Sequence, residues 1–254
     1  MSLPLLSVPS RLAMFLDFDG TLVELAEQPD QVHLRPSTCR ALAELERLLG
    51  GALAIVTGRE IASIDRFLHP LQLPIAGIHG LVRRDATGRV HMPDANDAFL
   101  ANAAAALGAL VARESGLLVE HKSQSVALHY RQRPDLEPLC LSEMERLANG
   151  TSGIVVKRGK MVVEAVSDGA DKGSAVLAFM AEAPFSGRLP LVAGDDVTDE
   201  DAFRVVNGLG GISIKIGEGP SMARFRAEGT QSFLAWLEST ASNMATEAGE
   251  HGRS

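Results

Sequence analysis

Two aspartates separated by one residue end a short apolar run in the sequence MFLDFDGTLVE, residues 14–24. In an extended chain, Asp17 and Asp19 point the same way, because residues two apart share a face. Repulsion between the two carboxylates is unfavourable, so their proximity needs a reason, such as binding a cation or acting on a phosphoryl group. Hard oxygen ligands suit Mg²⁺, which proteins hold with one or two carboxylates, water and substrate phosphate oxygens. The pair therefore indicates a metal or phosphoryl site.

A second group of acids lies far along the chain, in the string GDDVTDEDAF. Asp195 and Asp196 directly follow another apolar run, and Asp199 comes one turn later. Acids at the start of a helix are also what the helix dipole favours. For Asp199 and the acids after it, a role in the metal or phosphoryl site and simple stabilisation of a helix start both stay open. Asp195 comes just after the apolar run, and this position is better explained by a role as a metal ligand.

A cation and a hydroxyl group could complete such a site. Lys172 lies at the start of a predicted helix, in GADKGSAV, where the helix dipole disfavours a positive charge. Its place makes sense if it neutralises the acids or binds a phosphate, and the alternative is a solvated surface lysine. Thr57 and Gly58 follow the apolar run ALAIV and offer a hydroxyl and backbone N–H groups to a phosphate oxygen.

Three apolar runs position these residues, at 12–16, 52–56 and 189–193. Each is short and continuous, as expected of a parallel strand buried on both faces. A segment with helical spacing of leucines connects the first two, which predicts a strand–helix–strand unit with a right-handed crossover. Ligands of open parallel sheets bind beyond the carboxyl ends of the strands. We therefore expect one site at that edge of the sheet.

The middle of the chain has a different pattern. Short alternating strands at 116–131 and 153–166 are separated by helix-like stretches. The predicted fold class is α/β, a Rossmann-like parallel-sheet core with an inserted α+β cap domain carrying a small antiparallel sheet. The expected domains are a core made of residues 1–84 and 168–254 and a cap of residues 85–167. The tail after about residue 240 is expected to be disordered.

Composition excludes several classes of function. The chain has 254 residues and a formal net charge of −8, so it lacks the basic stripe that nucleic acids require. No apolar run approaches the roughly 20 residues of a membrane span, and the N-terminus has no basic region typical of a signal peptide. The two cysteines form no metal or redox motif. We expect a cytoplasmic monomer that acts on a small molecule.

The ordered motifs Asp17-x-Asp19-Gly20-Thr21, Thr57, Lys172 and Gly194-Asp195-Asp196-x-x-Asp199 resemble the haloacid dehalogenase superfamily of phosphohydrolases. Other strings resemble one family within it, the trehalose-6-phosphate phosphatases. They are GIHG at 77–80, Glu120-x-Lys122 with His129-Tyr130-Arg131, and KMVVEAVSDGADKG with Lys160 and Glu164. The chain departs from the family where Leu81-Val82-Arg83 replaces an acidic position and where Ala165 replaces a proline.

The resemblance implies roles for these residues. Asp17 would be the nucleophile and Asp19 the general acid and base, with Thr57, Lys172 and Asp199 also in the catalytic set. It implies that Mg²⁺ is held by Asp17, Asp19 (through its backbone carbonyl), Asp195 and Asp196. It implies that the substrate, a sugar phosphate, contacts Gly58, Arg59, His79, Glu120, Lys122, Arg131, Lys160 and Glu164.

Alternatives remain at this point. A capped phosphatase for another sugar phosphate, such as sucrose or mannosylglycerate phosphate, would differ in the cap alone. A catalytically silent, metal-binding regulatory relative is a second alternative, although the acids and Lys172 are all present. The charged residues of the cap could also be the solvated face of an antiparallel sheet, and His79 could pack within its loop.

Overall fold

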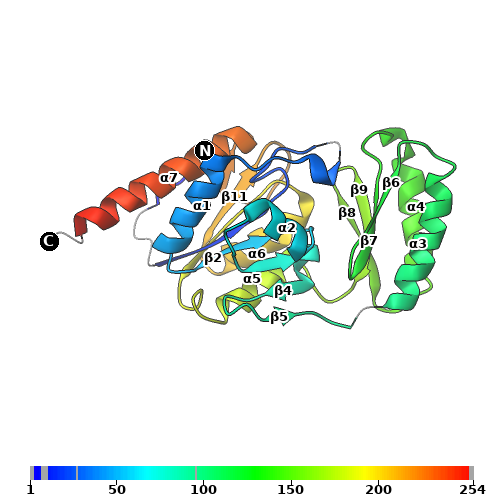
Figure 1. Cartoon of the computed structure of the whole chain (residues 1–254), viewed down its shortest axis with the longest axis horizontal. Coiled ribbons are helices and arrows are strands. Elements are labelled where there is room, and N and C mark those ends of the chain that lie inside the picture. The colour runs from blue at the N-terminus through cyan, green and yellow to red at the C-terminus, as the bar shows by residue number, and fades with distance from the viewer. Residues whose placement is uncertain (1–2, 7–10, 27, 95, 252–254) are drawn as a thin grey trace. The chain divides into compact units, whose positions relative to one another are not determined.

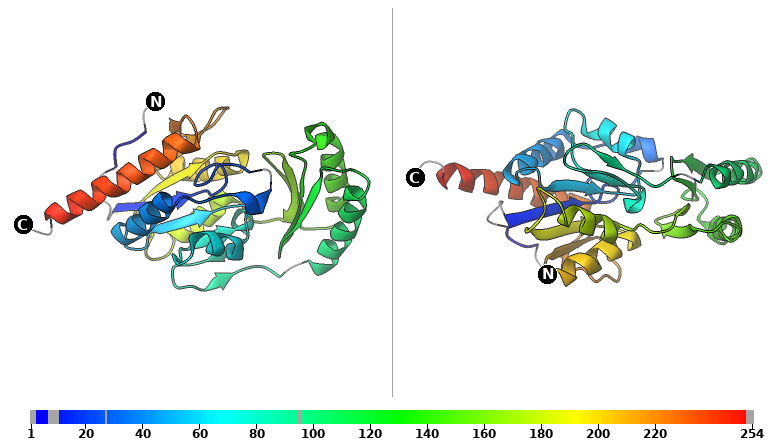
Figure 2. Two further views of the ribbon diagram at one scale, coloured as in Figure 1. Left: turned by 45° about the horizontal axis from the view of Figure 1, so that its top comes forward. Right: turned by 90° about the horizontal axis from the view of Figure 1, so that it is seen from below.

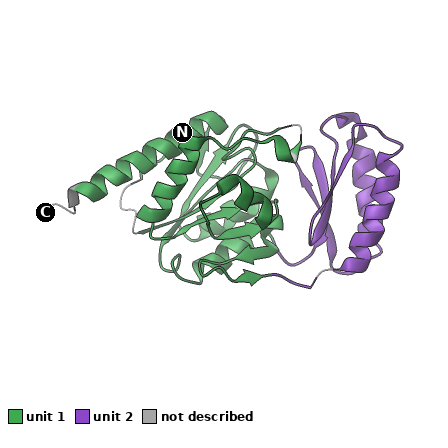
Figure 3. Cartoon of the chain, in the orientation of Figure 1, with its two compact units in different colours: residues 1–91, 171–254 green, residues 92–170 purple. Residues whose placement is uncertain are grey.

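The computed structural model of the protein describes residues 3–6, 11–26, 28–94 and 96–251 (Figure 1). The chain divides into two compact units, which are Met1–His91 with Asp171–Ser254 (unit 1) and Met92–Ala170 (unit 2) (Figure 3). Unit 2 is thus one insertion into unit 1, but it begins later than residue 85. The reason is that strands β4 (Val82–Arg84) and β5 (Val90–His91) pair with the sheet of unit 1.

An eight-stranded sheet forms the centre of unit 1, with strand order β12-β11-β10-β1-β2-β3-β4-β5. Its strands from β12 to β3 are parallel, and the last two are antiparallel. The parallel strands are β1 (Leu12–Leu16), β2 (Leu53–Val56), β3 (Ile75–Gly77), β10 (Leu189–Gly194), β11 (Ile212–Ile216) and β12 (Phe225–Ala227). The three apolar runs of the sequence are therefore neighbouring buried strands, and the predicted α/β fold class is confirmed.

Helices cover both faces of this sheet. Helices α1 (Pro36–Leu48) and α2 (Ile61–Leu68) lie on one face, whereas α5 (Lys172–Met180) and α6 (Glu200–Gly208) lie on the other (Figure 2). The sheet grows in opposite directions from β1 and from β10, so right-handed crossovers place their helices on opposite faces. Between β1 and the second helical layer, Phe15 stacks on Phe185 with ring centroids 5.4 Å apart.

The last helix corrects one prediction. Helix α7 (Thr230–His251) continues to His251, so the segment predicted to be disordered is helical from residue 240 to 251; residues 252–254 lie outside the described part of the chain. It packs against α1, where Thr38 donates a hydrogen bond of 3.2 Å to Glu238. Ala241 and Met244 are buried in the core of unit 1. Two apolar side chains three residues apart thus anchor the part of the helix after residue 240, although the surrounding sequence is polar.

Unit 2 is a four-stranded antiparallel sheet with strand order β6-β7-β9-β8. Its strands are β6 (Leu118–His121), β7 (Ser125–His129), β8 (Ile154–Gly159) and β9 (Val162–Ser167). Helices α3 (Asp97–Val111) and α4 (Glu137–Ala148) cover one face (Figure 3). Val126, Leu128 and Ala165 point into the core beneath them. Alternation then sends the intervening side chains to the other face.

Among the residues that the structure describes, none of the helices combines the length and the apolar character that a membrane span requires.

Candidate active site

Three buried carboxylates meet at the carboxyl edge of the large sheet. Asp17 follows β1 and Asp195 follows β10, and these strands are direct neighbours, with Leu16 opposite Ala193. Asp199 ends a short 3₁₀ helix (Val197–Asp199) just beyond Asp195. One carboxylate oxygen from each of the three residues lies within 4.8 Å of the others. We call these three residues the acid cluster.

Two glycines allow this close approach. A Cβ atom on Gly20 would lie 2.1 Å from a carboxylate oxygen of Asp195, and one on Gly194 would lie 2.2 Å from the Asp199 carboxyl carbon. Gly20 also has φ +79°, a conformation that side chains disfavour. Both positions therefore require glycine if the acids are to converge.

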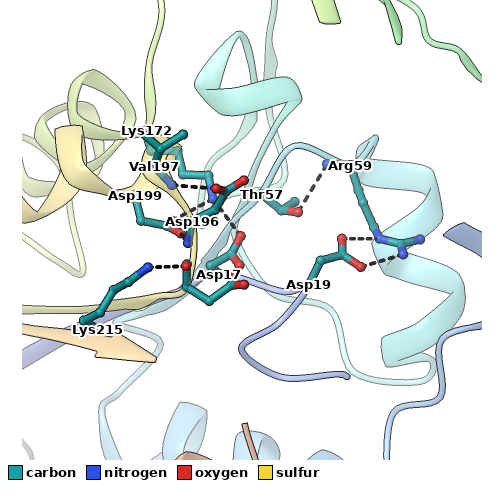
Figure 4. Close-up of polar contacts among 10 residues, drawn as sticks. Asp17, Asp19, Thr57, Arg59, Lys172, Asp196, Val197, Asp199 and Lys215 are labelled. Atoms are coloured by element: carbon teal, nitrogen blue, oxygen red, sulfur yellow. Dashed lines mark hydrogen bonds and ion pairs between the residues drawn. The ribbon is translucent and has the colours of Figure 1, made fainter. Parts of the chain in front are cut away.

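Lys172 lies against the acid cluster and is only 3% exposed. Its Nζ donates hydrogen bonds of 2.7 Å to Asp17 and of 2.7 Å to Asp199 (Figure 4). The lysine begins helix α5, whose N-cap Asp171 forms a capping box with Ser174. The cap stabilises the helix start, and the two carboxylates outweigh the unfavourable helix dipole at Lys172.

Burial dominates the electrostatics of the cluster. It raises the pKa of Asp17 well above the ordinary range; Lys172 lowers that pKa, and the nearby Asp199 and Asp195 raise it further. Burial also disfavours the Lys172 ammonium, but Asp17 and Asp199 outweigh it and raise the lysine pKa. A divalent cation would favour the ionised Asp17 in the same way. Three converging buried oxygen donors suit such a cation, so these residues could hold a divalent metal.

The remaining acids of GDDVTDEDAF have local partners. The Asp196 carboxylate accepts a hydrogen bond of 2.7 Å from the Val197 backbone, and its own N–H donates to Asp199 at 2.9 Å. Glu200 accepts a bond from the Met222 backbone, and Asp201 pairs with Arg204. Asp196 is a helix cap here and is not in the acid cluster, so its role as a metal ligand stays a prediction.

The loop after β2 carries Thr57, Gly58 and Arg59. The Thr57 hydroxyl accepts a hydrogen bond of 3.2 Å from the Arg59 backbone. A Cβ atom on Gly58 would lie 2.7 Å from the His79 ring, and the His79 backbone donates to Thr57 at 2.9 Å. His79 has φ 55°. These contacts place His79 against the loop after β2, and its role in substrate binding stays a prediction.

Arg59 binds Asp19 rather than the acid cluster. Its Nε and Nη2 donate to the two carboxylate oxygens of Asp19 at 2.6 and 2.7 Å. The Asp19 side chain points toward Arg59 and away from Lys172 (Figure 4). The structure thus brings Asp17, Asp195, Asp199 and Lys172 together and places Asp19 beside them with a partner of its own.

Sequence reasoning missed Lys215. This lysine of β11 is 6% exposed, and its Nζ donates a hydrogen bond to the backbone carbonyl of Asp195. The signal was a lone lysine in the apolar strand ISIKI, whose buried charge needs a partner. Thr230 was missed as well, and its hydroxyl donates to the Gly20 carbonyl at 2.6 Å. Both residues fix the backbone of the loops that carry the acids.

In unit 2, the face away from the helices carries a group of polar side chains, which we call the polar face: Glu120, Lys122, Ser125, His129 and Glu164. Glu164 of β9 accepts hydrogen bonds from Lys122 at 3.0 Å and from the Ser125 hydroxyl. Glu120 of β6 pairs with His129 of β7 at 2.8 Å. Burial raises the pKa of Glu120, but the hydrogen bond from His129 and the charge of Lys122 outweigh burial and lower it overall.

The two other cap candidates lie in loops at one end of this sheet. Arg131 follows β7, and its guanidinium donates a hydrogen bond of 3.3 Å to the backbone carbonyl of Lys160. Lys160 and Met161 form the turn between β8 and β9, where Met161 has φ 64°. The structure therefore gathers the predicted cap residues into two neighbouring sets within unit 2.

Solved structures with this architecture define the class of the protein. The fold matches a haloacid dehalogenase-like hydrolase from B. subtilis at 12% identity and TM-score 0.62, over 90% of this chain and 99% of that one. A trehalose-6-phosphate phosphatase related protein matches at 29% identity and TM-score 0.78, over 93% of this chain and 99% of that one. The fold is that of the haloacid dehalogenase-like hydrolases.

Sequence comparison places the chain within that class. The family model described as trehalose-phosphatase matches residues 15–231. The trehalose-6-phosphate phosphatase of Escherichia coli K12 is 39% identical, over 94% of this chain and 91% of its own length. A probable trehalose-phosphate phosphatase of Sinorhizobium fredii is 48% identical, over 81% of this chain and 77% of its own length. The protein belongs to the trehalose-phosphatase family of phosphoric monoester hydrolases.

Proposed function

We propose that the protein is a Mg²⁺-dependent phosphatase that hydrolyses trehalose 6-phosphate to trehalose and phosphate through an aspartyl-phosphate. The observation that carries the proposal is the buried Asp17 carboxylate, hydrogen-bonded to Lys172 between Asp195 and Asp199. Family membership supports the choice of substrate, because two relatives are named as trehalose-phosphate phosphatases.

The acid cluster is the proposed metal site. Asp17, Asp195 and the backbone carbonyl of Asp19 would hold Mg²⁺, and Asp196 and Asp199 would support it. A bound Mg²⁺ would neutralise charge on the transferring phosphoryl group. The position of Lys215 on the Asp195 carbonyl supports this assignment, because that bond holds the backbone of a proposed ligand.

The chain's own residues account for the two chemical steps. An Asp17 oxygen attacks phosphorus, and the bond from phosphorus to the sugar oxygen breaks as Asp19 gives that oxygen a proton. A water molecule then attacks phosphorus, Asp19 takes the water's proton, and the bond between Asp17 and phosphorus breaks. Lys172 and Thr57 would bind the phosphoryl oxygens, whose negative charge needs donors in the transition state.

The polar face of unit 2 is the proposed source of sugar selectivity. Glu120 and Glu164 offer charged hydrogen-bonding groups on strands, and Lys122 adds one just after β6. Arg131 and Lys160 add cations in loops. Groups of this kind reject an analogue that lacks the matching hydroxyl, because they are then left unpaired. A phosphatase for another sugar phosphate is the alternative, and it would keep the chemistry of unit 1.

Phosphate release from a panel of substrates tests the proposal. The panel contains trehalose 6-phosphate, sucrose 6-phosphate, glucose 6-phosphate and an aryl phosphate, each with Mg²⁺ and with EDTA. We expect Mg²⁺-dependent turnover with a preference for trehalose 6-phosphate of at least about 100-fold. Equal rates across the panel would support phosphatase activity but reject trehalose 6-phosphate as the preferred substrate. No phosphate release from any substrate would reject both claims. The monomeric state and cytoplasmic location stay predictions.

A further inference from the structure

Arg59 is held in one conformation by contacts along its whole length. Its guanidinium carbon lies 5.4 Å from the centroid of the Phe18 ring and 5.3 Å from that of Phe67 in helix α2. The residue as a whole is 8% exposed. Contacts between a guanidinium and two aromatic rings are attractive and restrict the side chain.

The backbone of Arg59 is fixed as well. Its N–H donates to the Thr57 hydroxyl at 3.2 Å, and its carbonyl accepts from the Ile78 N–H at 3.0 Å. Gly77 approaches that carbonyl so closely that a Cβ atom would lie 2.6 Å from it. The arginine is therefore a rigid group at the edge of the site.

This rigid fork engages both oxygens of Asp19. A bidentate arginine–carboxylate pair sets the plane of the carboxylate as well as its position. Among the described residues, the acid cluster consists of Asp17, Asp195 and Asp199, and Asp19 lies outside it. Lys172 offers a competing positive charge beside the acid cluster, yet Asp19 points away from it (Figure 4).

That orientation suits proton transfer to a leaving group. In phosphoryl transfer the attacking and leaving oxygens are roughly in line on opposite sides of phosphorus. An acid for the leaving oxygen must therefore be held apart from the nucleophile. We propose that Arg59 is the positioning residue that keeps Asp19 apart from the acid cluster and oriented toward the leaving oxygen. This role differs from the substrate contact predicted from the sequence. The inference rests on the proposed function, since it takes Asp19 as the general acid and base.

The test compares two substrates that differ in their need for a proton. Trehalose 6-phosphate has a poor leaving group that needs a proton, whereas the aryloxide of an activated aryl phosphate leaves without protonation. For Arg59→Gln we expect kcat on trehalose 6-phosphate to fall by about 10- to 100-fold with little change in KM. Release of the aryl alcohol in the first turnover should stay within about threefold of wild type. Arg59→Lys should restore part of the loss, because lysine supplies one donor without the fork.

A matched control exists in the same unit. Arg84 makes an equivalent bidentate pair with Asp65, with both bonds at 2.7 Å, and its side-chain exposure of 17% resembles the 10% of Arg59. Arg84→Gln removes a similar ion pair away from Asp19. We expect it to leave the ratio of the two substrates' rates unchanged. Thermal unfolding midpoints of all variants separate loss of fold from loss of orientation.

A double-mutant cycle decides whether Arg59 acts through Asp19. In an Asp19→Ala background, Arg59→Gln should cause no further loss of trehalose 6-phosphate turnover. Additive losses, equal losses on both substrates, or a rise confined to KM would each overturn the inference. An Asp19→Ala variant with wild-type kcat on trehalose 6-phosphate would instead overturn the proposed role of Asp19, which distinguishes the two failures.

Discussion

The acid cluster of unit 1 and the polar face of unit 2 are built in different ways. In unit 1, the contacting residues come from loops after separate strands and from a helix start, and Lys172 and Asp17 are 155 positions apart. In unit 2, the contacts join strands of one antiparallel sheet, and Glu120 and His129 are 9 positions apart. The first arrangement depends on topology and the second on strand register.

This difference affects how each region tolerates change. The acids of unit 1 converge only because Gly20 and Gly194 let the backbone approach the carboxylates closely. The proposed chemistry therefore depends on the backbone conformation of these loops. The side chains of unit 2 stand on one face of a regular sheet, where a substitution alters a contact and leaves the strand pairing intact. Chemistry should therefore be the harder property to change, and selectivity the easier one.

Replacing Asp17, the proposed nucleophile, should have the largest effect. Asp17→Asn removes the attacking oxygen's charge and keeps the side chain's size, so we expect turnover of every substrate to fall by at least about 1,000-fold. Rates of phosphate release measure the loss, and the unfolding midpoint checks the fold. Activity within about tenfold of wild type would contradict the assignment of Asp17.

Gly20→Ala tests the dependence on backbone approach. The added methyl would overlap the Asp195 carboxylate, so we expect a loss of about 100-fold or more on both sugar and aryl phosphates, with weaker Mg²⁺ binding measured by calorimetry. Gly88→Ala is the matched control. Gly88 has a similar φ of +88°, but no described atom lies within 4 Å of its Cβ position. If both variants lost activity equally, backbone strain rather than contact with Asp195 would be responsible.

A change on the polar face of unit 2 should be selective. Glu164→Gln keeps the size of the side chain but weakens its bonds to Lys122 and Ser125. We expect kcat/KM for trehalose 6-phosphate to fall by about 10- to 100-fold while that of an aryl phosphate stays unchanged. Glu143→Gln, on an exposed ion pair of helix α4, is the control. A parallel loss on the aryl phosphate would show that unit 2 is not a selectivity element.

The smallest effect is expected at Asp85, which shapes the hairpin between β4 and β5. Hydrogen bonds from Thr87 and then from His91 lower the pKa of the Asp85 carboxyl. Because the folded pKa lies below the unfolded one, this stabilisation is complete above about pH 4 and is lost as the pH falls further. Asp85→Asn should thus lower the unfolding midpoint by about a few degrees at pH 7 and by less at pH 3.

Activity under standard conditions should not change in this variant. A midpoint difference that is the same at both pH values would show that the carboxylate charge contributes nothing. Measurements of thermal unfolding at the two pH values, on wild type and Asp85→Asn together, subtract the titration of the other acids.

The sequence predicted best what strand order determines. Asp17, Asp195 and Lys172 could be assigned to one site because each lies next to a buried element, and the carboxyl ends of parallel strands share one edge. The parallel sheet itself was predicted from the three continuous apolar runs and the helix that connects the first two. These inferences need only the direction of the chain, which hydrophobic patterning reveals.

Other features depend on contacts that patterning does not encode. Lys215 binds the backbone carbonyl of Asp195. Every residue has such a carbonyl, so the sequence does not show which one the lysine binds. The Arg59 guanidinium that pairs with Asp19 also contacts the rings of Phe18 and Phe67, and Phe67 belongs to a helix that the spacing of residues does not connect to Asp19. Helix α7 extends past residue 240 because Ala241 and Met244 reach the core, and two apolar residues in a polar tail are a weak signal.

The insertion of unit 2 has a consequence for the order of folding. Strand β1 pairs with β10, and a ribosome makes all of residues 92–170 between them. Unit 2 is continuous in sequence, so its strands and helices are complete before β10 exists. The central pairing of unit 1 must close a much longer loop, which is entropically costly and slow. During synthesis, the acid cluster is therefore assembled only after residues 92–170 have been made. Strand β1 can pair with β2 before that, but its other edge stays unpaired until β10 is synthesised.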